Sequence, residues 1–186
     1  MTKPRKCKIC KAPFVQFSTL HTVCSPRCGL ELALRNIAKR EASHKRILRA
    51  ELKEARERLK TKSDHVKELD TIFSKYIRLR DRLKPCICCG EPLGMNASGG
   101  NYDAGHYVSR SHMATRWDEA NVHAQRKHCN RYLGGNPIGF EEGIIQRLGE
   151  PEVVRLKALR HTTVNYSIPA IQELIVYYKL RCKEMT

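Results

Sequence analysis

Apolar residues recur at helical spacing through most of this chain, and two long helices are predicted in its first half. The segment from about residue 29 to residue 60 is rich in Ala, Leu, Glu, Lys and Arg and contains no proline, which predicts one long helix. Glu41 and Lys45 interrupt its apolar side, so we expect at most a short pairing with another helix. That pairing would use a narrow seam at 4-3-4 spacing, made of Leu48, Leu52, Ala55 and Leu59.

The second helix is predicted to begin at Ser63, a favourable N-cap residue, and to end near Leu83. We expect this helix to pack onto the cysteine-containing unit that follows it in the sequence. One face would carry Val66, Leu69, Phe73, Tyr76 and Arg80.

The C-terminal half alternates between turn signals and shorter helical patterns. The run GMNASGGN at residues 94–101 predicts an exposed turn, and Pro137 suits the first position of a helix. The last helix is expected to bury Ile171, Leu174, Ile175, Tyr178 and Cys182. Helices are predicted at residues 138–148, 151–160 and 169–183.

Basic residues are concentrated in the first third of the chain. The whole sequence has 35 Lys and Arg against 19 Asp and Glu, a formal charge of +16, and residues 1–62 alone carry 17 against 5. Lys and Arg displace condensed counterions from a phosphate backbone, so this excess favours nucleic acid as a partner. We expect no membrane partner, because no stretch is apolar enough to span a bilayer. The N-terminus lacks an apolar signal core, which favours a cytoplasmic protein.

The nine cysteines occur mainly in closely spaced groups, which in a reducing cytosol bind metal more often than they form disulfides. Two pairs lie in residues 1–28: Cys7 with Cys10, and Cys24 with Cys28. Four thiolates suit a tetrahedral zinc ion and leave no coordination position open. We therefore expect a structural zinc site here; the alternative is a set of unligated core cysteines.

The stretch from Asp103 to Asn130 carries the pattern with the most chemistry in the chain. Hydrolysis of a phosphodiester needs a base that activates water and a cation that stabilises the developing charge. We expect His106 to be the base, because the pKa of a free imidazole lies near the working pH. Asn121 would hold the hairpin and His106 in orientation, and Asn130 would ligate or orient a catalytic Mg2+ or Mn2+.

Several neighbouring residues are weaker candidates. Asp103 offers a hard oxygen ligand, but on a strand it would point away from His106 unless the chain bends at Gly105. His123 is a second-tier catalytic candidate. His112 and His161 lack such a context and are expected to be structural or solvated. Phosphate contacts are expected from Arg110, Lys127 and Arg131.

These motifs resemble those of the HNH nuclease superfamily, whose signature is a histidine on a first strand, an asparagine that opens the next strand, and a Cys-x-x-Cys-His that enters a helix. The present chain is an H-N-N version, with Asn130 where the last histidine usually stands. Nearly the whole chain resembles the NinG (Rap) recombination proteins of lambdoid phages, through RKCKIC, KPCICCG, YDAGHYVSR, NVHAQ and HCNRYLGGNP. The resemblance implies an α+β fold with a zinc-supported ββα-metal nuclease core. It also implies an endonuclease of the host-cell cytoplasm that acts on branched DNA such as Holliday junctions, D-loops and other joint molecules.

The chain departs from this family pattern at Arg126, where the pattern has a cysteine that pairs with Cys129. Cys86, Cys89 and Cys129 then supply only three thiolates to a second zinc site. The fourth ligand would be His128, or Cys88 after some rearrangement, or water. Because a structural zinc site contributes on the order of 10 kcal/mol to folding, a missing ligand would weaken or abolish activity.

These expectations divide the chain into four segments and leave three functions open. The leading one is a divalent-metal-dependent DNA endonuclease. The alternatives are a non-catalytic zinc protein that binds DNA, and a regulator that binds a partner through the 48–59 seam. A two-fold dimer would suit a symmetric junction. The segments are a zinc knuckle at 1–28, basic helical arm and linker helices at 29–84, a nuclease core at 85–136 and a helical segment at 137–186.

Overall fold

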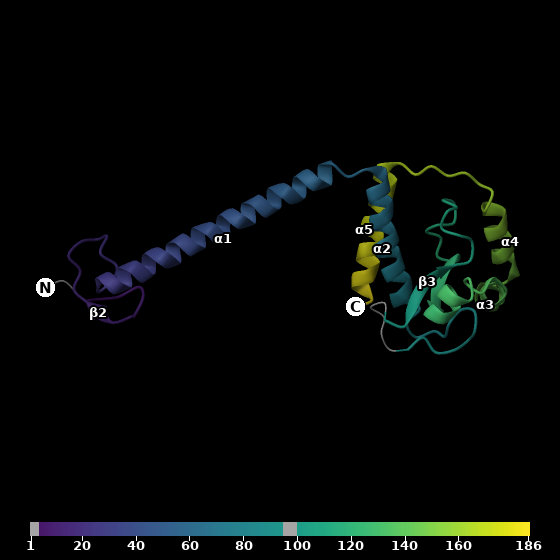
Figure 1. The fold of residues 1–186 in the computed structure, drawn as a ribbon, viewed down its shortest axis with the longest axis horizontal. Coiled ribbons are helices and arrows are strands. Elements are labelled where there is room, and N and C mark those ends of the chain that lie inside the picture. Colours follow the sequence, from purple (N-terminus) through teal and green to yellow (C-terminus); the bar gives the residue numbers. More distant parts are fainter. Residues whose placement is uncertain (1–3, 95–99) are drawn as a thin grey trace. The chain divides into compact units, whose positions relative to one another are not determined.

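The computed structural model describes residues 4–94 and 100–186, and the chain divides into two compact units (Figure 1). The first unit contains residues 1–59 and the second contains residues 60–186. The boundary falls inside the expected helical segment 29–84, so the two long helices belong to different units. Most of the turn expected at residues 94–101 lies outside the described residues.

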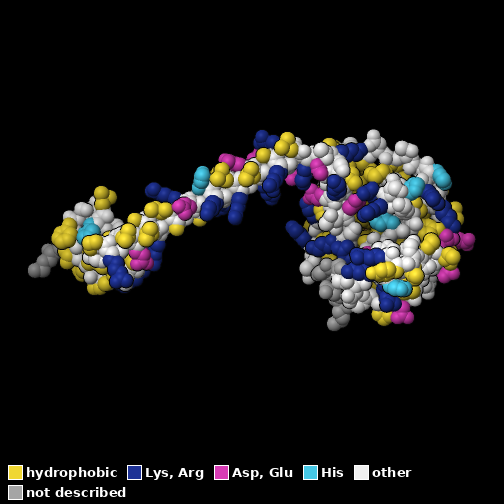
Figure 2. Space-filling view, viewed as in Figure 1, with side chains coloured by type: hydrophobic (Ala, Val, Ile, Leu, Met, Phe, Trp, Pro, Cys, Tyr) yellow, Lys and Arg dark blue, Asp and Glu magenta, His cyan; other side chains and the backbone are white. Residues whose placement is uncertain are grey.

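The first unit consists of a short hairpin and one long helix. Strand β1 (Arg5–Lys6) pairs with β2 (Pro13–Phe14), and helix α1 spans Pro26–Arg58. Helix α1 begins earlier than predicted because the hydroxyl of Ser25 accepts a hydrogen bond from the backbone N of Cys28 at 3.3 Å. The helix is uninterrupted for 33 residues, as predicted, and Cys28 is its one buried residue. Figure 2 shows basic side chains distributed along α1.

The core of the second unit is formed mainly by two helices, α2 (Lys62–Arg80) and α5 (Ile168–Glu184). The N-cap of α2 is Thr61 rather than the predicted Ser63, because Asp64 completes a capping box with it. The predicted apolar face is confirmed, but its main partner is α5, and the hairpin that follows is a secondary one. The buried side chains of the two helices are Leu69, Phe73, Tyr76, Ile77, Ile171, Ile175, Tyr178 and Cys182.

A second hairpin carries the predicted base His106 and the weaker candidates Asp103 and His123. Strands β3 (Tyr102–His106) and β4 (Val122–Arg126) are antiparallel, and His106 lies opposite Val122. The pairing is regular along both strands, with no bend at Gly105. Because side chains alternate along a strand, His106 and Asp103 project from opposite faces of the hairpin.

Three helical segments follow the hairpin. A short π-helical turn, η1 (His128–Tyr132), leads into α3 (Pro137–Leu148) and α4 (Glu150–Leu159), and Gly149 with φ of 92° separates α3 from α4. The predicted helices and the position of Pro137 are confirmed. Helices α3 and α4 close over the segment after β3 through Val108, Phe140, Ile144, Val153 and Leu156.

The fold is mixed, with helices separate from the two small antiparallel sheets seen in the described part of the chain. The α+β class is therefore confirmed. Across residues 4–94 and 100–186, no helix has both the length and the apolar character needed to cross a bilayer.

Candidate functional site

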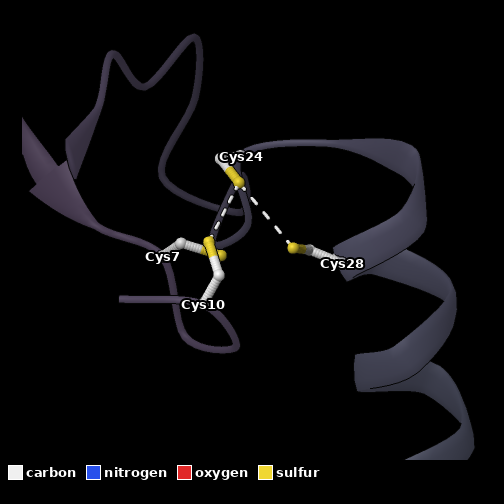
Figure 3. A group of neighbouring side chains, drawn as sticks. All are labelled: Cys7, Cys10, Cys24 and Cys28. Carbon is white, nitrogen blue, oxygen red and sulfur yellow. Dashed lines mark hydrogen bonds between the residues drawn. The ribbon is translucent and has the colours of Figure 1, made fainter. Parts of the chain in front are cut away.

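Four thiols of the first unit converge at one point (Figure 3). Their sulfur atoms all lie within 4.8 Å of one another, with Sγ–Sγ distances of 3.4 Å for Cys10–Cys24 and 3.7 Å for Cys24–Cys28. A tetrahedral zinc ion with ligands at 2.3 Å separates its sulfurs by about 3.8 Å, whereas a disulfide needs about 2.05 Å. The four thiols, Cys7, Cys10, Cys24 and Cys28, therefore fit a structural zinc ion.

The backbone around Cys7 favours the thiolate that zinc requires. Burial would raise the pKa of this thiol, but hydrogen bonds from the backbone of Ile9, Cys10 and Cys24 outweigh it and lower the pKa to about 6. Cys28 lies in the first turn of α1, so an ion held here would fix the start of that helix.

The same backbone turn occurs again in the second unit, in residues 86–91. In both 7–12 and 86–91, the N–H of the first cysteine donates at 2.8 Å to the carbonyl five residues later. The fifth residue of each turn donates back to that cysteine's carbonyl at 3.1 Å. The fifth residues, Lys11 and Gly90, have φ of 62° and 72°, in the left-handed region. Residues 86–91 therefore form a turn of the same construction as residues 7–12, with cysteines at its first and fourth positions.

The second thiol cluster contains four cysteines, although Arg126 stands where the family pattern has a cysteine. Cys86, Cys88, Cys89 and Cys129 have sulfur atoms within 4.8 Å of one another. The Sγ–Sγ distances are 3.5 Å for Cys86–Cys88 and 3.5 Å for Cys89–Cys129. Cys88 supplies the fourth thiol, and its sulfur accepts a hydrogen bond from Nε2 of Gln125 at 3.3 Å. This set also fits a zinc ion.

His128 does not belong to the second cluster, contrary to one of the three options considered from the sequence. Its side chain is exposed, and its ring centroid lies 6.1 Å from that of Tyr132. Position 126 does border the cluster, because the backbone N of Arg126 donates to Sγ of Cys86 at 3.3 Å. The fourth thiol of the cluster is therefore that of Cys88, and residue 126 contacts the cluster through its backbone.

The ring of His106 is anchored through one of its nitrogen atoms. Nε2 lies 3.1 Å from the carbonyl oxygen of Arg116. A carbonyl only accepts hydrogen bonds, so Nε2 carries the proton and Nδ1 is left as an acceptor. Among the described residues, no group forms a hydrogen bond with Nδ1. Burial lowers the pKa of His106 below its ordinary 6.5, so the ring is neutral at pH 7.

His106 lines an open cavity of about 470 Å3. Ser74 comes from α2, Arg110 from the segment after β3, and Asn130 from η1. The base candidate, one basic side chain and the carboxamide after Cys129 are thus brought to the same cavity. His106 and Asn130 thus lie at one cavity, as the sequence pattern predicts.

Asp70 of α2 holds the segment that anchors His106. Its carboxylate accepts two hydrogen bonds from the guanidinium of Arg116, at 2.9 and 2.5 Å, and one from Nε1 of Trp117 at 2.9 Å. No local pattern in the sequence predicts this contact, because Asp70 and Arg116 are 46 positions apart. Asp70 is a residue that sequence reasoning missed.

Asn121 is fully buried, and its side chain joins two parts of the segment between β3 and β4. Its Oδ1 accepts from the backbone N of Val108 at 2.7 Å, and its Nδ2 donates to the carbonyls of Val108 and Thr115, each at 2.9 Å. These contacts fit the predicted positioning function. Asn121 is not among the residues that line the His106 cavity.

Asp103 and Asn130 lie in direct contact. Nδ2 of Asn130 donates to Oδ2 of Asp103 at 3.1 Å, and Arg131 donates to both carboxylate oxygens, at 2.8 and 3.1 Å. Burial would raise the pKa of Asp103, but the hydrogen bonds from Arg131 and Asn130 outweigh it and lower the pKa. The Asp103 carboxylate is therefore ionised beside Asn130, and both of its oxygens accept hydrogen bonds from Arg131.

His123 has a structural environment. It projects from the opposite face to His106, and its ring is buried. Nε2 lies 3.0 Å from the carbonyl of Ala120, and Nδ1 lies 3.1 Å from the guanidinium of Arg80 and 3.6 Å from the carboxylate of Asp81. Both ring nitrogens are thus engaged, and the ring joins the end of α2 to β4.

The three predicted phosphate contacts have different environments. Arg110 is exposed and lines the His106 cavity. Nζ of Lys127 donates to the carbonyl of Gly100 at 2.6 Å, and Arg131 is paired with Asp103. Arg110 is thus the one placed at the cavity.

Comparison with known proteins gives the family. Residues 1–186 match the family model described as "Bacteriophage Lambda NinG protein". The chain is 30% identical to Protein ninG of Escherichia phage 933W over 199 residues and 29% identical to that of Escherichia phage lambda over 201 residues, covering 100% of this chain and 96% of each relative. It is 32% identical to Protein ninG of Enterobacteria phage H19B, over 85% of this chain and 83% of the relative. No solved structure gives a significant match. The chain belongs to the NinG family.

Proposed function

We propose that this NinG-family chain is a divalent-metal-dependent DNA endonuclease in which His106 is the general base. The observation that supports it most is the anchoring of Nε2 by the Arg116 carbonyl, which leaves Nδ1 of a neutral ring free at the cavity. A water molecule that donates to Nδ1 would lose its proton to that nitrogen. The resulting hydroxide would attack the phosphorus of a phosphodiester, and the leaving oxygen would take a proton from solvent.

We propose that Asn130, which lines the His106 cavity, holds the catalytic cation together with Asp103, which contacts Asn130 but projects from the opposite face of the hairpin to His106. A carboxamide oxygen and an ionised carboxylate are the hard donors that Mg2+ and Mn2+ prefer. A bound cation would supply charge stabilisation on the phosphate and on the leaving oxygen. Binding would require the side chain of Arg131 to leave Asp103, and Arg131 would then be free to contact a phosphate.

Zinc at the two thiol clusters is the structural part of the proposal. The second cluster joins the turn at residues 86–91 to Cys129, the residue directly before Asn130. A zinc ion held there would fix the position of η1 relative to β3 and would set the distance between Asn130 and His106. The proposed role of the cysteines in the reaction is therefore to position Asn130 and His106.

DNA is the proposed substrate because of the charge distribution. Residues 1–62 carry 17 Lys and Arg against 5 Asp and Glu, and Arg110 lies at the cavity itself. Branched recombination intermediates are the substrate class that the family resemblance suggests. A cytoplasmic location in the phage host and a two-fold dimer on a symmetric junction are further parts of this proposal.

The test compares cleavage and binding of a labelled four-way junction, with and without Mg2+, by wild type, His106→Ala and the control His44→Ala. His44 is an exposed histidine of α1. We expect Mg2+-dependent cleavage by wild type and by the control, with His106→Ala binding the junction but not cutting it. If His106→Ala cuts as fast as wild type, the assignment of the base is wrong.

A second candidate function is a non-catalytic zinc protein that binds DNA. The pairing of Arg131 with both oxygens of Asp103 favours it, because that pairing leaves the carboxylate unavailable to a cation. Equal binding of the junction by all three proteins, with no cleavage by any of them, would support this alternative.

A further inference from the structure

A second cavity, of about 570 Å3, adjoins the one that contains His106. We call it the α4 cavity, because the end of α4 forms one of its walls. Tyr107 and Ser109 line both cavities, so the two cavities share a wall. The volume lies within the range of about 300–1,000 Å3 typical of pockets that bind small ligands.

One side of the α4 cavity is basic. Lys157, Arg160 and His161 are exposed at the end of α4, and His112 lies among the lining residues. The acid in the lining is Glu141, which already accepts a hydrogen bond from Nζ of Lys157 at 2.9 Å and one from the hydroxyl of Tyr107.

The guanidinium of Arg160 belongs to this basic side of the α4 cavity. Across residues 4–94 and 100–186, no side chain forms a hydrogen bond or ion pair with it. A group that presents an anion to this wall would therefore meet an unpaired cation.

The other side of the cavity is apolar. Val108, Pro137 and Ile138 line it, and Ile138 is 75% exposed although it is aliphatic. An apolar surface beside an unpaired guanidinium suits a ligand that has both a flat apolar part and an anionic part. A nucleotide has these two parts, a base and a phosphate.

We propose that the α4 cavity binds a nucleotide that neighbours the scissile phosphate, with its phosphate on Arg160 and His161 and its base against Ile138 and Pro137. This inference rests on the proposed function, because the His106 cavity must hold the scissile phosphate. A base inside a duplex is stacked between its neighbours and cannot enter such a pocket. The preferred substrate is therefore DNA with an unpaired nucleotide next to the cleaved bond.

The test measures binding of two fluorescein-labelled 30-base-pair duplexes, one fully paired and one with a single unpaired nucleotide at its centre, without added Mg2+ or Mn2+. The proteins are wild type, Arg160→Ala, Ile138→Ala and the control Lys183→Ala, which removes an exposed charge from α5. Each affinity is measured at several salt concentrations, and thermal melting checks that each variant is folded.

We expect wild type and Lys183→Ala to prefer the duplex with the unpaired nucleotide. Ile138→Ala should lose roughly five-fold or more of that preference, with the salt dependence unchanged, because it removes apolar surface against which the unpaired base packs. Arg160→Ala should weaken binding and reduce the slope of log K against log salt by about 0.7–0.9, the loss of one phosphate contact.

Two results would overturn the proposal, and they are distinguishable. If wild type has no preference for the duplex with the unpaired nucleotide, or if both cavity variants bind the two duplexes as wild type does, the α4 cavity is not a nucleotide site; the proposed function is decided separately by the cleavage test on the four-way junction. If wild type binds neither duplex and does not cut the junction in that test, the proposed function fails and this inference fails with it.

Discussion

Nε2 of His106 lies 3.1 Å from the carbonyl oxygen of Arg116, and this contact determines which nitrogen of the ring carries the proton. The carbonyl is held in place because the guanidinium of the same residue is bound by Asp70. Asp70 of helix α2 therefore influences which nitrogen of His106 carries the proton, because it holds the residue whose carbonyl accepts from Nε2. The proposed base and its orientation depend on a carboxylate that belongs to a different element.

Substitution of Asp70 by Asn tests this relationship. The charge of Asp70 raises the pKa of His106, so its removal should move the acidic limb of the pH–rate profile of DNA cleavage to lower pH. The weaker clamp on Arg116 should also lower kcat by about ten-fold, equivalent to about 1.4 kcal/mol, with KM unchanged. Glu68→Gln is the matched control, since Glu68 lies on the same helix and pairs with Lys60 and Lys179. An unchanged pH profile in Asp70→Asn would contradict the account.

The burial of His106 and His123 has a consequence for stability. Desolvation lowers the pKa of both rings below 6.5, so the unfolded chain binds more protons than the folded chain near that pH. Their contribution to the free energy of unfolding is therefore fully present above pH 6.5 and is lost as the pH falls through the lowered values. Urea unfolding at pH 7.5 and 5.5 should show the decrease, and it should shrink in His123→Gln. A stability that rises as the pH falls through 6.5 would contradict this sign.

Zinc binding at the second thiol cluster should be lost when Cys88 is replaced and restored when a cysteine is introduced at position 126. Wild type should bind close to two zinc ions per chain and Cys88→Ser close to one, because the second cluster keeps three thiols. Arg126→Cys in the Cys88→Ser background should restore the second ion, since the backbone of residue 126 already contacts Cys86. Elemental analysis of the purified proteins measures these counts.

The control for that experiment is Cys182→Ser, a buried thiol outside both clusters, which should leave the count at two. Retention of two ions by Cys88→Ser would mean that another group completes the site.

Asn121→Ala should destabilise the second unit. The change leaves the N–H and carbonyl of Val108 and the carbonyl of Thr115 without their buried partner. One such group costs about 1–3 kcal/mol, so we expect a total loss of about 3 kcal/mol in urea unfolding. Asn165→Ala, at an exposed position, should cost much less. Equal stability of the two variants would show that Asn121 does not hold the segment.

The local features of this chain were predictable from its sequence, and the long-range ones were not. The long helices, Pro137 at the start of α3 and the Cys7–Cys28 cluster follow from short-range patterns. The choice of Cys88 over His128 required the geometry of the turn at 86–91. The contact between Asp70 and Arg116 joins residues that no periodicity relates, and the pairing of α2 with α5 depends on packing across the whole second unit.

Chemical rescue of His106→Ala tests whether His106 is the general base. A general base that takes its proton on Nδ1 can be replaced in part by free imidazole, provided that the cavity is open. We predict that Mg2+-dependent cleavage of a labelled four-way junction is lost in His106→Ala and returns in proportion to added imidazole, while wild type is unaffected. Cleavage by His106→Ala at the wild-type rate without imidazole would contradict it.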